Sequence, residues 1–294
     1  MVCSIAENGF YIYIMQPITT IIKNRATVFL TIYYFFVAIW WLVLLELGSI
    51  NNVSNYLFAF FYSLIPLMGG IFGIINSHKW GFLKSVVGKS TFFISLGLIT
   101  WAIGQIVFSY YNLFLNIEIP YPSLADASFI LSWPLWGIGI FFLLQATGVK
   151  YGLREKIGKV LLLILPILVI VASYYLLVVI AKQGLFEFSG WSPKTFFDLA
   201  YPIGDVVILT MTTIVLGLSY KLFGGELRIP IYIILLGFIV NYFADFSFSY
   251  TTTLQTFYSG NWVDFLFTTA MFFISLGLSM LSPHFLDLEK IKEV

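Results

Sequence analysis

Charged residues are scarce in this chain of 294 residues. They make up 10% of it, whereas hydrophobic residues make up 60%. A soluble domain carries roughly 25% charged residues, and no long stretch here is polar enough to build a water-facing surface. This scarcity excludes an ordinary soluble fold and indicates that lipid is the main solvent. The net charge of +1 also gives no long-range attraction for nucleic acid.

Cysteine, histidine and buried lysine are almost absent as well. The single cysteine, Cys3, excludes an intrachain disulfide, a thiolate metal site and an iron–sulfur cluster. The two histidines, His78 and His284, stand beside charged residues at expected helix ends, which argues against a bis-histidine haem. No predicted helix interior contains a lysine that could form a retinal Schiff base. We therefore expect no cofactor and no metal ion.

Apolar segments long enough to cross a bilayer are abundant. A span needs about 20 mostly apolar residues, and open strands would leave backbone groups unpaired in lipid. The sequence therefore predicts an all-α integral membrane protein with about eight transmembrane helices. The predicted spans are Thr27–Leu47, Tyr56–Ile75, Thr91–Tyr111, Ala125–Gln145, Val160–Ile180, Phe196–Leu218, Ile229–Ser249 and Val263–Leu281.

These spans divide the chain into three parts. Residues 1–26 form a predicted interfacial segment, because the apolar stretch Phe10–Ile22 is too short to span and contains Pro17. Residues 27–281 form the predicted eight-helix transmembrane domain. Residues 282–294 form a predicted short cytoplasmic tail.

Basic residues predict the orientation. Of the 15 lysines and arginines, all but Lys182 and Lys194 fall in segments that alternate with the expected outer loops. Cytoplasmic loops carry an excess of Lys and Arg. We therefore expect an integral protein of the cell membrane with both termini in the cytoplasm.

Acidic residues follow the opposite distribution. Eight of the 14 fall in the outer loops or the outward half of the membrane, where acids contribute little to the orientation rule. They are Glu46, Glu118, Asp126, Glu187, Asp198, Asp205, Asp245 and Asp264. The outward half is therefore negative, so we expect either that a ligand bound there is cationic or that desolvation keeps the acids partly protonated.

An internal similarity relates two pairs of helices. The segment Trp101–Tyr110 matches Asn241–Tyr250 and places Gln105 opposite Asp245. An outer loop and an acid, Asp126 or Asp264, follow in each case. We predict that the eight helices form four repeated hairpins, parallel repeats about an axis along the membrane normal.

Intramembrane acids are the main candidates for function, because burying a charge in lipid is costly and such residues usually face the bundle interior. Asp205 is the deepest acid, and we expect Asp205, Asp245 and Gln105 to face one cavity that opens to the outside. Hydrogen bonding that only fixes helix packing is the alternative. Asp126 and Asp264 either line this cavity or, like Asp198, only cap helix starts. The candidate ligand-binding residues, including the expected aromatic walls, are Gln105, Asp126, Trp133, Tyr201, Asp205, Asp245, Trp262 and Asp264.

Three short motifs carry a family resemblance. They are Tyr121-Pro-Ser-Leu-Ala-Asp126 with Trp133-Pro134, then Leu199-Ala-Tyr-Pro-Ile-Gly-Asp205, then Ala244-Asp245 followed by Gly260 to Asp264. Together they resemble the multi-pass membrane sensor regions that precede diguanylate cyclase (GGDEF) or histidine kinase output domains. The sequence ends at Val294, shortly after the last predicted helix. The resemblance therefore implies a stand-alone sensor region.

Three functions remain open. The first is a ligand-sensing or receptor-like module with a polar and aromatic pocket on the outer face, for a small cationic or amphipathic ligand, which signals through a separate cytoplasmic protein. The second is a small-molecule or ion transporter that uses the same acids. The third is a non-catalytic membrane assembly subunit. An enzyme is not expected, because no metal triad or Ser/His/Asp set is available. An aspartyl dyad formed by Asp205 and Asp245 stays open as an alternative, although the residues around them do not resemble its known signatures.

The orientation is testable by chemical labelling. Single cysteines at Lys84 or Arg154, in a Cys3→Ser background, should resist a membrane-impermeant thiol reagent in whole cells and react after lysis. A cysteine at Lys194 should react in whole cells. Labelling of the first two positions in intact cells would overturn the predicted topology.

Overall fold

The computed structural model describes residues 24–115, 117, 119–147, 152–184, 190–219 and 227–283. Within these ranges the chain is all-α, and eight helices are long and apolar enough to cross a membrane. The predicted all-α architecture is thereby confirmed, as are the eight predicted spans within the described ranges, and the protein is a multi-pass integral membrane protein. Most of the predicted interfacial segment and cytoplasmic tail lies outside the described residues.

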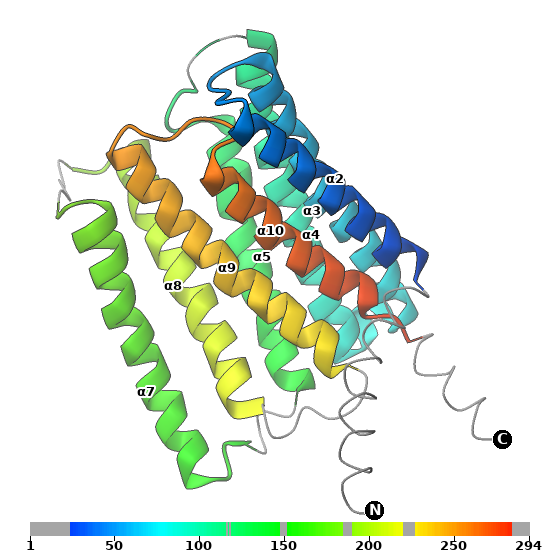
Figure 1. Ribbon diagram of the computed structural model, residues 1–294. Coiled ribbons are helices and arrows are strands. Elements are labelled where there is room, and N and C mark those ends of the chain that lie inside the picture. Colours follow the sequence, from blue (N-terminus) through cyan, green and yellow to red (C-terminus); the bar gives the residue numbers. More distant parts are fainter. Residues whose placement is uncertain are drawn as a thin grey trace, which may run out of the picture.

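The eight spanning helices are α2 Arg25–Glu46, α3 Val53–Lys79, α4 Val86–Tyr110, α5 Leu124–Ala146, α7 Lys156–Ser173, α8 Pro193–Ser219, α9 Arg228–Thr253 and α10 Trp262–Met280. Consecutive spanning helices pack against each other, except that α5 packs against α8 and not against α7 (Figure 1). Two of them continue at their ends as π-helices, α4 through Tyr111–Leu115 (η2) and α7 through Tyr174–Ala181 (η3). A short 3₁₀ turn, η1 at Phe82–Lys84, precedes α4.

Short polar side chains determine where several helices begin. The side chains of Asn24, Asn52 and Ser85 accept hydrogen bonds from the first backbone N–H groups of α2, α3 and α4, at 3.0, 3.1 and 2.9 Å. These N–H groups have no partner inside the helix. Because such caps lie outside the apolar stretches, α3 and α4 begin three and five residues before the predicted starts at Tyr56 and Thr91.

Six helices form a closed ring. Going around it, α3, α4, α5, α8, α9 and α10 each pack against the next, and α10 returns to α3. Helix α2 packs on the outside against α3 and α10, and α7 packs against α8 (Figure 1). The arrangement brings α5, α8 and α9 together, although 81 residues (147–227) lie between the end of α5 and the start of α9.

The start of α2 and the end of α10 lie at the same end of the bundle. Asn24 Nδ2 donates to the carbonyl of Ser279 at 2.6 Å, and the hydroxyls of Thr27 and Ser279 are 2.9 Å apart. The chain therefore enters and leaves the described bundle on one side, as an even number of crossings requires.

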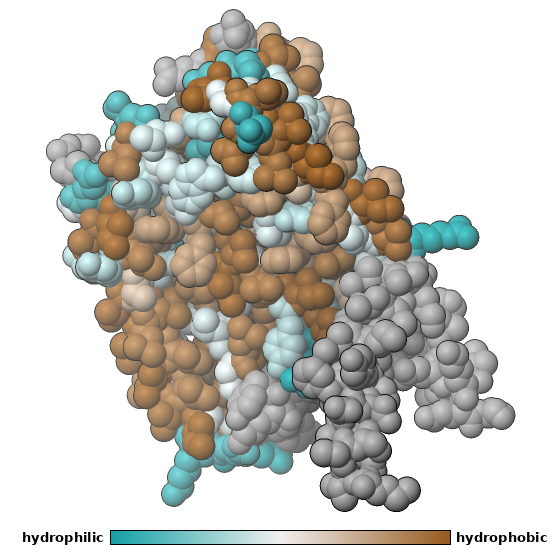
Figure 2. Space-filling view, viewed as in Figure 1, coloured by the Kyte–Doolittle hydropathy of each residue, from teal (hydrophilic) through white to brown (hydrophobic). Residues whose placement is uncertain are grey.

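The two outer helices carry the apolar surface. Ile32 of α2 and Leu163 of α7 are 65% and 67% exposed. Figure 2 shows hydrophobic residues along each of these helices, with hydrophilic residues toward the two ends of the molecule. A monomer in water rarely exposes so large an apolar patch. The surface is that of a protein surrounded by lipid.

Glycines bring the helices of two hairpins into close contact. In the α4–α5 pair, a Cβ at Gly97 would lie 2.3 Å from Cδ1 of Trp136, and one at Gly139 would lie 2.5 Å from Cγ1 of Ile94. Small residues allow such approach in membranes, where packing rather than water drives helix association.

The α9–α10 pair is built in the same way. A Cβ at Gly237 would lie 2.5 Å from Cγ1 of Ile274, and one at Gly277 would lie 2.5 Å from Cγ1 of Ile234. Any side chain at these positions would push the two helices apart.

We therefore expect Gly237→Ala to destabilise the bundle, because its Cβ would also lie 2.8 Å from the backbone nitrogen of Ile274. Overpacking of this kind costs about 1–3 kcal/mol, which should lower the midpoint of thermal unfolding in detergent. The matched control is Gly137→Ala on α5, whose nearest neighbour would be 3.9 Å away. Equal midpoints for the two variants would contradict the packing described.

Candidate functional site

Two carboxyl groups meet inside the bundle. Asp205 on α8 and Asp245 on α9 lie within hydrogen-bonding reach of each other, and we call them the acid pair. Asp205 is only 5% exposed, and it lies twelve residues after Pro193, where α8 begins. That spacing places it about 18 Å along the helix. The sequence-based expectation that these two acids come together agrees with this contact.

Two neutral side chains donate to the acid pair. Trp133 Nε1 on α5 donates to Asp205 Oδ1 at 3.2 Å, and Asn241 Nδ2 donates to Asp245 Oδ2 at 2.7 Å. Asn241 itself is only 3% exposed, and its Oδ1 atom has no hydrogen-bond partner in the structure. A buried acceptor without a partner is costly, and this one belongs to the amide that contacts the pair.

Local sequence explains how these groups converge. Tyr201 and Asp205 are four residues apart on α8, as are Asn241 and Asp245 on α9, so each couple shares one helix face. Gly204 allows α5 to approach, because a Cβ there would lie 2.7 Å from Cγ of Trp133. The indole can therefore pack against the α8 backbone and reach the next residue, Asp205.

Another acid, Asp126, lies near the start of α5. Tyr201 Oη donates to Asp126 Oδ1 at 2.7 Å, and the Tyr201 ring meets Trp133 edge to face at 4.9 Å. The other oxygen of Asp126 accepts from the backbone N–H of Ser123 at 2.6 Å, which completes a capping box. Asp126 therefore caps α5, as one interpretation of the sequence expected, and also joins the site through Tyr201.

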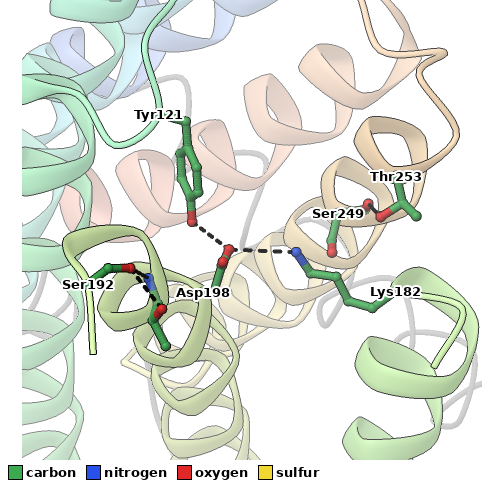
Figure 3. A network of polar contacts seen from close by, with 7 residues as sticks. Tyr121, Lys182, Ser192, Asp198, Ser249 and Thr253 are labelled. Atoms are coloured by element: carbon green, nitrogen blue, oxygen red, sulfur yellow. Dashed lines mark hydrogen bonds and ion pairs between the residues drawn. The ribbon is translucent and has the colours of Figure 1, made fainter. Parts of the chain in front are cut away.

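A third polar group lies toward the loop ends of α5, α7 and α8. Figure 3 shows Asp198 between Tyr121, whose hydroxyl donates at 2.9 Å, and Lys182, whose Nζ is 3.9 Å away. Burial and the hydrogen bond to Asp198 raise the pKa of Tyr121 well above its usual range, so that this phenol remains a donor. We call these three residues the outer network.

The capping role expected for Asp198 is wrong. Helix α8 begins at Pro193, three residues before the predicted start, and Ser192 Oγ accepts the backbone N–H of Thr195 at 3.1 Å. Asp198 therefore lies in the second turn, where backbone N–H groups already have partners inside the helix. Its carboxylate is available for Tyr121 and Lys182.

The remaining candidates lie elsewhere. Asp264 accepts from the backbone of Gly260 at 2.6 Å and from Tyr62 Oη at 3.4 Å, near α3. Trp262, in the first turn of α10, is 48% exposed. Gln105 is buried on α4, which packs mainly against α3 and α5. In the described part of the chain, the hydrogen bonds to the acid pair involve none of these three residues.

Asn241 was not among the residues selected from the sequence. Its position one helical turn from Asp245 was a usable signal, since residues four apart share a helix face. Tyr121 and Lys182 were also not selected. Their meeting depends on how three loops lie together, which no local pattern encodes.

Comparison with known proteins adds no family. No protein-family model, no curated protein and no solved structure matches the chain. The fold and the site therefore define the class, a multi-pass integral membrane protein whose described residues include eight helices long enough to span, with acids buried between α5, α8 and α9.

The contact between Tyr201 and Asp126 should be measurable as a coupling energy. Tyr201→Phe and Asp126→Asn should each lower the thermal unfolding midpoint, and the double variant should lose less than the sum. Hydrogen bonds to charged groups contribute about 1.5–3 kcal/mol, so the coupling should fall in that range. Tyr174→Phe, at an exposed position on η3, should show no coupling with Asp126→Asn. Additive losses for Tyr201 and Asp126 would contradict the contact.

Proposed function

We propose that this chain is a ligand-sensing, receptor-like membrane module that binds a small cation at the acid pair. The site is a binding site without a catalytic role. The observation that carries the proposal is that the polar atoms left unsatisfied there are acceptors. Asn241 Oδ1 is buried without a partner, and each carboxylate can accept further hydrogen bonds beyond the one from Trp133 or Asn241.

The inventory of donors supports a cationic occupant. Trp133 and Asn241 each supply one N–H to the pair, and carboxylates accept several hydrogen bonds each. The ion pair Lys182–Asp198 lies in the outer network rather than at the acid pair. A cation or a strong donor would satisfy the remaining acceptors, whereas an anion would be repelled.

The proposed route to the site runs from the loop end of α8. The outer network comes first, the Asp126–Tyr201 contact next, and the acid pair deepest along the same helix. Asp245 is partly exposed, so it is the member of the pair that an entering ligand meets. The distribution of basic residues supports placing this end outside the cell.

The motifs that resemble sensor regions contact one another at this site. Tyr121 and Asp126 of the first motif bond to Asp198 and Tyr201, in or beside the second motif. Trp133, which follows the first motif, bonds to Asp205, which ends the second. This clustering supports ligand sensing. The proposed partner is a separate cytoplasmic signalling protein, reached through the basic inner loops or the tail at 282–294.

We also propose that hairpins two (α4–α5) and four (α9–α10) are repeats. The alignment of Gln105 with Asp245 places Gly97 opposite Gly237, and these glycines face Trp136 and Ile274 in the two hairpins. Gly139 and Gly277 correspond in the same way. The capping acids also match, since a tyrosine from another hairpin donates to each, Tyr201 to Asp126 and Tyr62 to Asp264.

The proposed repeat allows the acid pair to be compared with the equivalent positions in the other half of the molecule. Extending the correspondence of Tyr62 with Tyr201 by four residues places Pro66 opposite Asp205, and Gln105 stands opposite Asp245. The equivalent position in the other half of the molecule therefore has no acid. Uncharged residues are therefore sufficient for helix packing at the equivalent positions. This supports a role in binding, rather than in packing, for the carboxyl groups of Asp205 and Asp245.

Transport is the second candidate. Thr212 lies two turns beyond Asp205 along α8, fully buried, with a hydroxyl oxygen that has no partner. With Asn241 it extends the polar groups toward the other end of the bundle, as a pathway through the protein would require.

Cation binding can be tested on the purified protein in detergent. Sodium, potassium, ammonium and spermidine, at constant ionic strength, should include at least one that raises the unfolding midpoint. Saturation at 100 times Kd corresponds to about 2.7 kcal/mol. Asp205→Asn and Asp245→Asn should lose this stabilisation. Glu46→Gln, an exposed acid on α2, is the matched control and should keep it.

Two results would contradict the proposal. One is a wild-type protein that no cation stabilises, which would favour an assembly subunit. The other is equal stabilisation of all variants. Cation flux into liposomes would favour the transporter, and binding without flux would favour the sensor.

A further inference from the structure

We propose that the acid pair holds one proton when it is empty and exchanges that proton for one monovalent cation. The inference rests on the proposed function and specifies its ligand class. It makes the module responsive to the ratio of that cation to protons on the side from which the site is reached.

The proton follows from the contact itself. Ionised carboxylates are acceptors only, so Asp205 and Asp245 can bond to each other only when a proton lies between them. Trp133 and Asn241 bind other lone pairs of the same groups. The pair and its two donors therefore form one hydrogen-bonded unit with a net charge of −1.

The oxygens available favour a small monovalent ion. Asp205, Asp245 and the orphan Oδ1 of Asn241 supply carboxylate and amide oxygens, the ligands of hard cations. Nowhere in the described ranges do three His, Cys, Asp or Glu side chains meet as a metal-binding group. A divalent ion would therefore have at most two charged ligands.

The exchange balances in atoms and charge. A cation that bridges both carboxylates occupies the place of the shared proton, because carboxyl ligands must be deprotonated to bind a metal ion. One cation enters, the O–H bond breaks, and one proton leaves to water past Asp245, the partly exposed member. The net charge stays at −1, so the exchange does not change the charge buried in the bundle.

The titratable groups near the acid pair do not supply the exchangeable proton, because each of them already donates to another residue. Tyr242 on α9 is near Asp205 and donates to Ser173 Oγ on the neighbouring α7 at 2.8 Å. Tyr201 on α8 donates to Asp126 on α5. Both phenols are already donors in hydrogen bonds, so the exchangeable proton belongs to the acid pair.

The test measures proton release directly. Purified protein in weakly buffered detergent receives sodium chloride, or choline chloride at the same ionic strength as a control, with a pH-indicator dye present. Bound sodium is measured in parallel with a radioactive tracer. We expect about one proton released per sodium bound, and none with choline. The apparent Kd for sodium should rise about tenfold for each pH unit on the acidic side.

Variants assign the effect to the acid pair. Asp245→Asn should abolish proton release and weaken sodium binding, whereas Glu46→Gln should behave as the wild type. If Asp245→Asn does not fold, the proton count and the pH dependence of the wild type still decide the question.

Three outcomes would overturn the inference. Sodium binding without proton release would leave the proposed function intact and remove the exchange. Proton release driven by calcium chloride but not by sodium, potassium or lithium would exclude a monovalent ligand. Absence of binding by any cation would remove the proposed function as well.

Discussion

The cost of placing a charge in lipid is the constraint on which this structure depends. Asp205 is deep in α8 and nearly inaccessible, so its carboxyl group needs partners from within the protein. It finds them on two other helices, Trp133 on α5 and Asp245 on α9. The close approach at Gly204 that lets Trp133 reach it also fixes how α5 and α8 pack. The same contact therefore gives the Asp205 carboxyl group a hydrogen-bond partner and determines how α5 packs against α8.

Hydropathy predicted the eight spans because the bilayer imposes a minimum apolar length on each helix. It did not predict the helix ends, since these depend on capping groups such as Asn52 and Ser85 outside the apolar stretches. The error had a consequence for function. Placing the start of α8 at Phe196 made Asp198 a capping residue, whereas the cap is Ser192 and Asp198 bonds to Tyr121 and Lys182.

The part of the candidate site that could be predicted from the sequence is the part whose position is determined by the cost of burying a charge in lipid. Two intramembrane acids had few alternatives to facing the interior, and Asp205 and Asp245 do meet. Gln105 and Trp262 carry no charge and can be satisfied in several places, so their neighbours depend on the order of helices around the ring. That order places α4 between α3 and α5 and places α9 beside α8. No helical periodicity in the sequence encodes it.

The positive charge of the outer network is paired near the loops and does not neutralise the deeper acid pair. Lys182 contacts Asp198 and not the deeper acids, so it offsets a negative charge near the loops. In the proposed function, the attraction for a cation is thereby concentrated on Asp205 and Asp245, where the surrounding protein screens charge least. A lysine within reach of the pair would satisfy the same acceptors and fill the site permanently. Placing it beside Asp198 instead leaves the acceptors of the acid pair and Asn241 for the exchangeable cation that we propose.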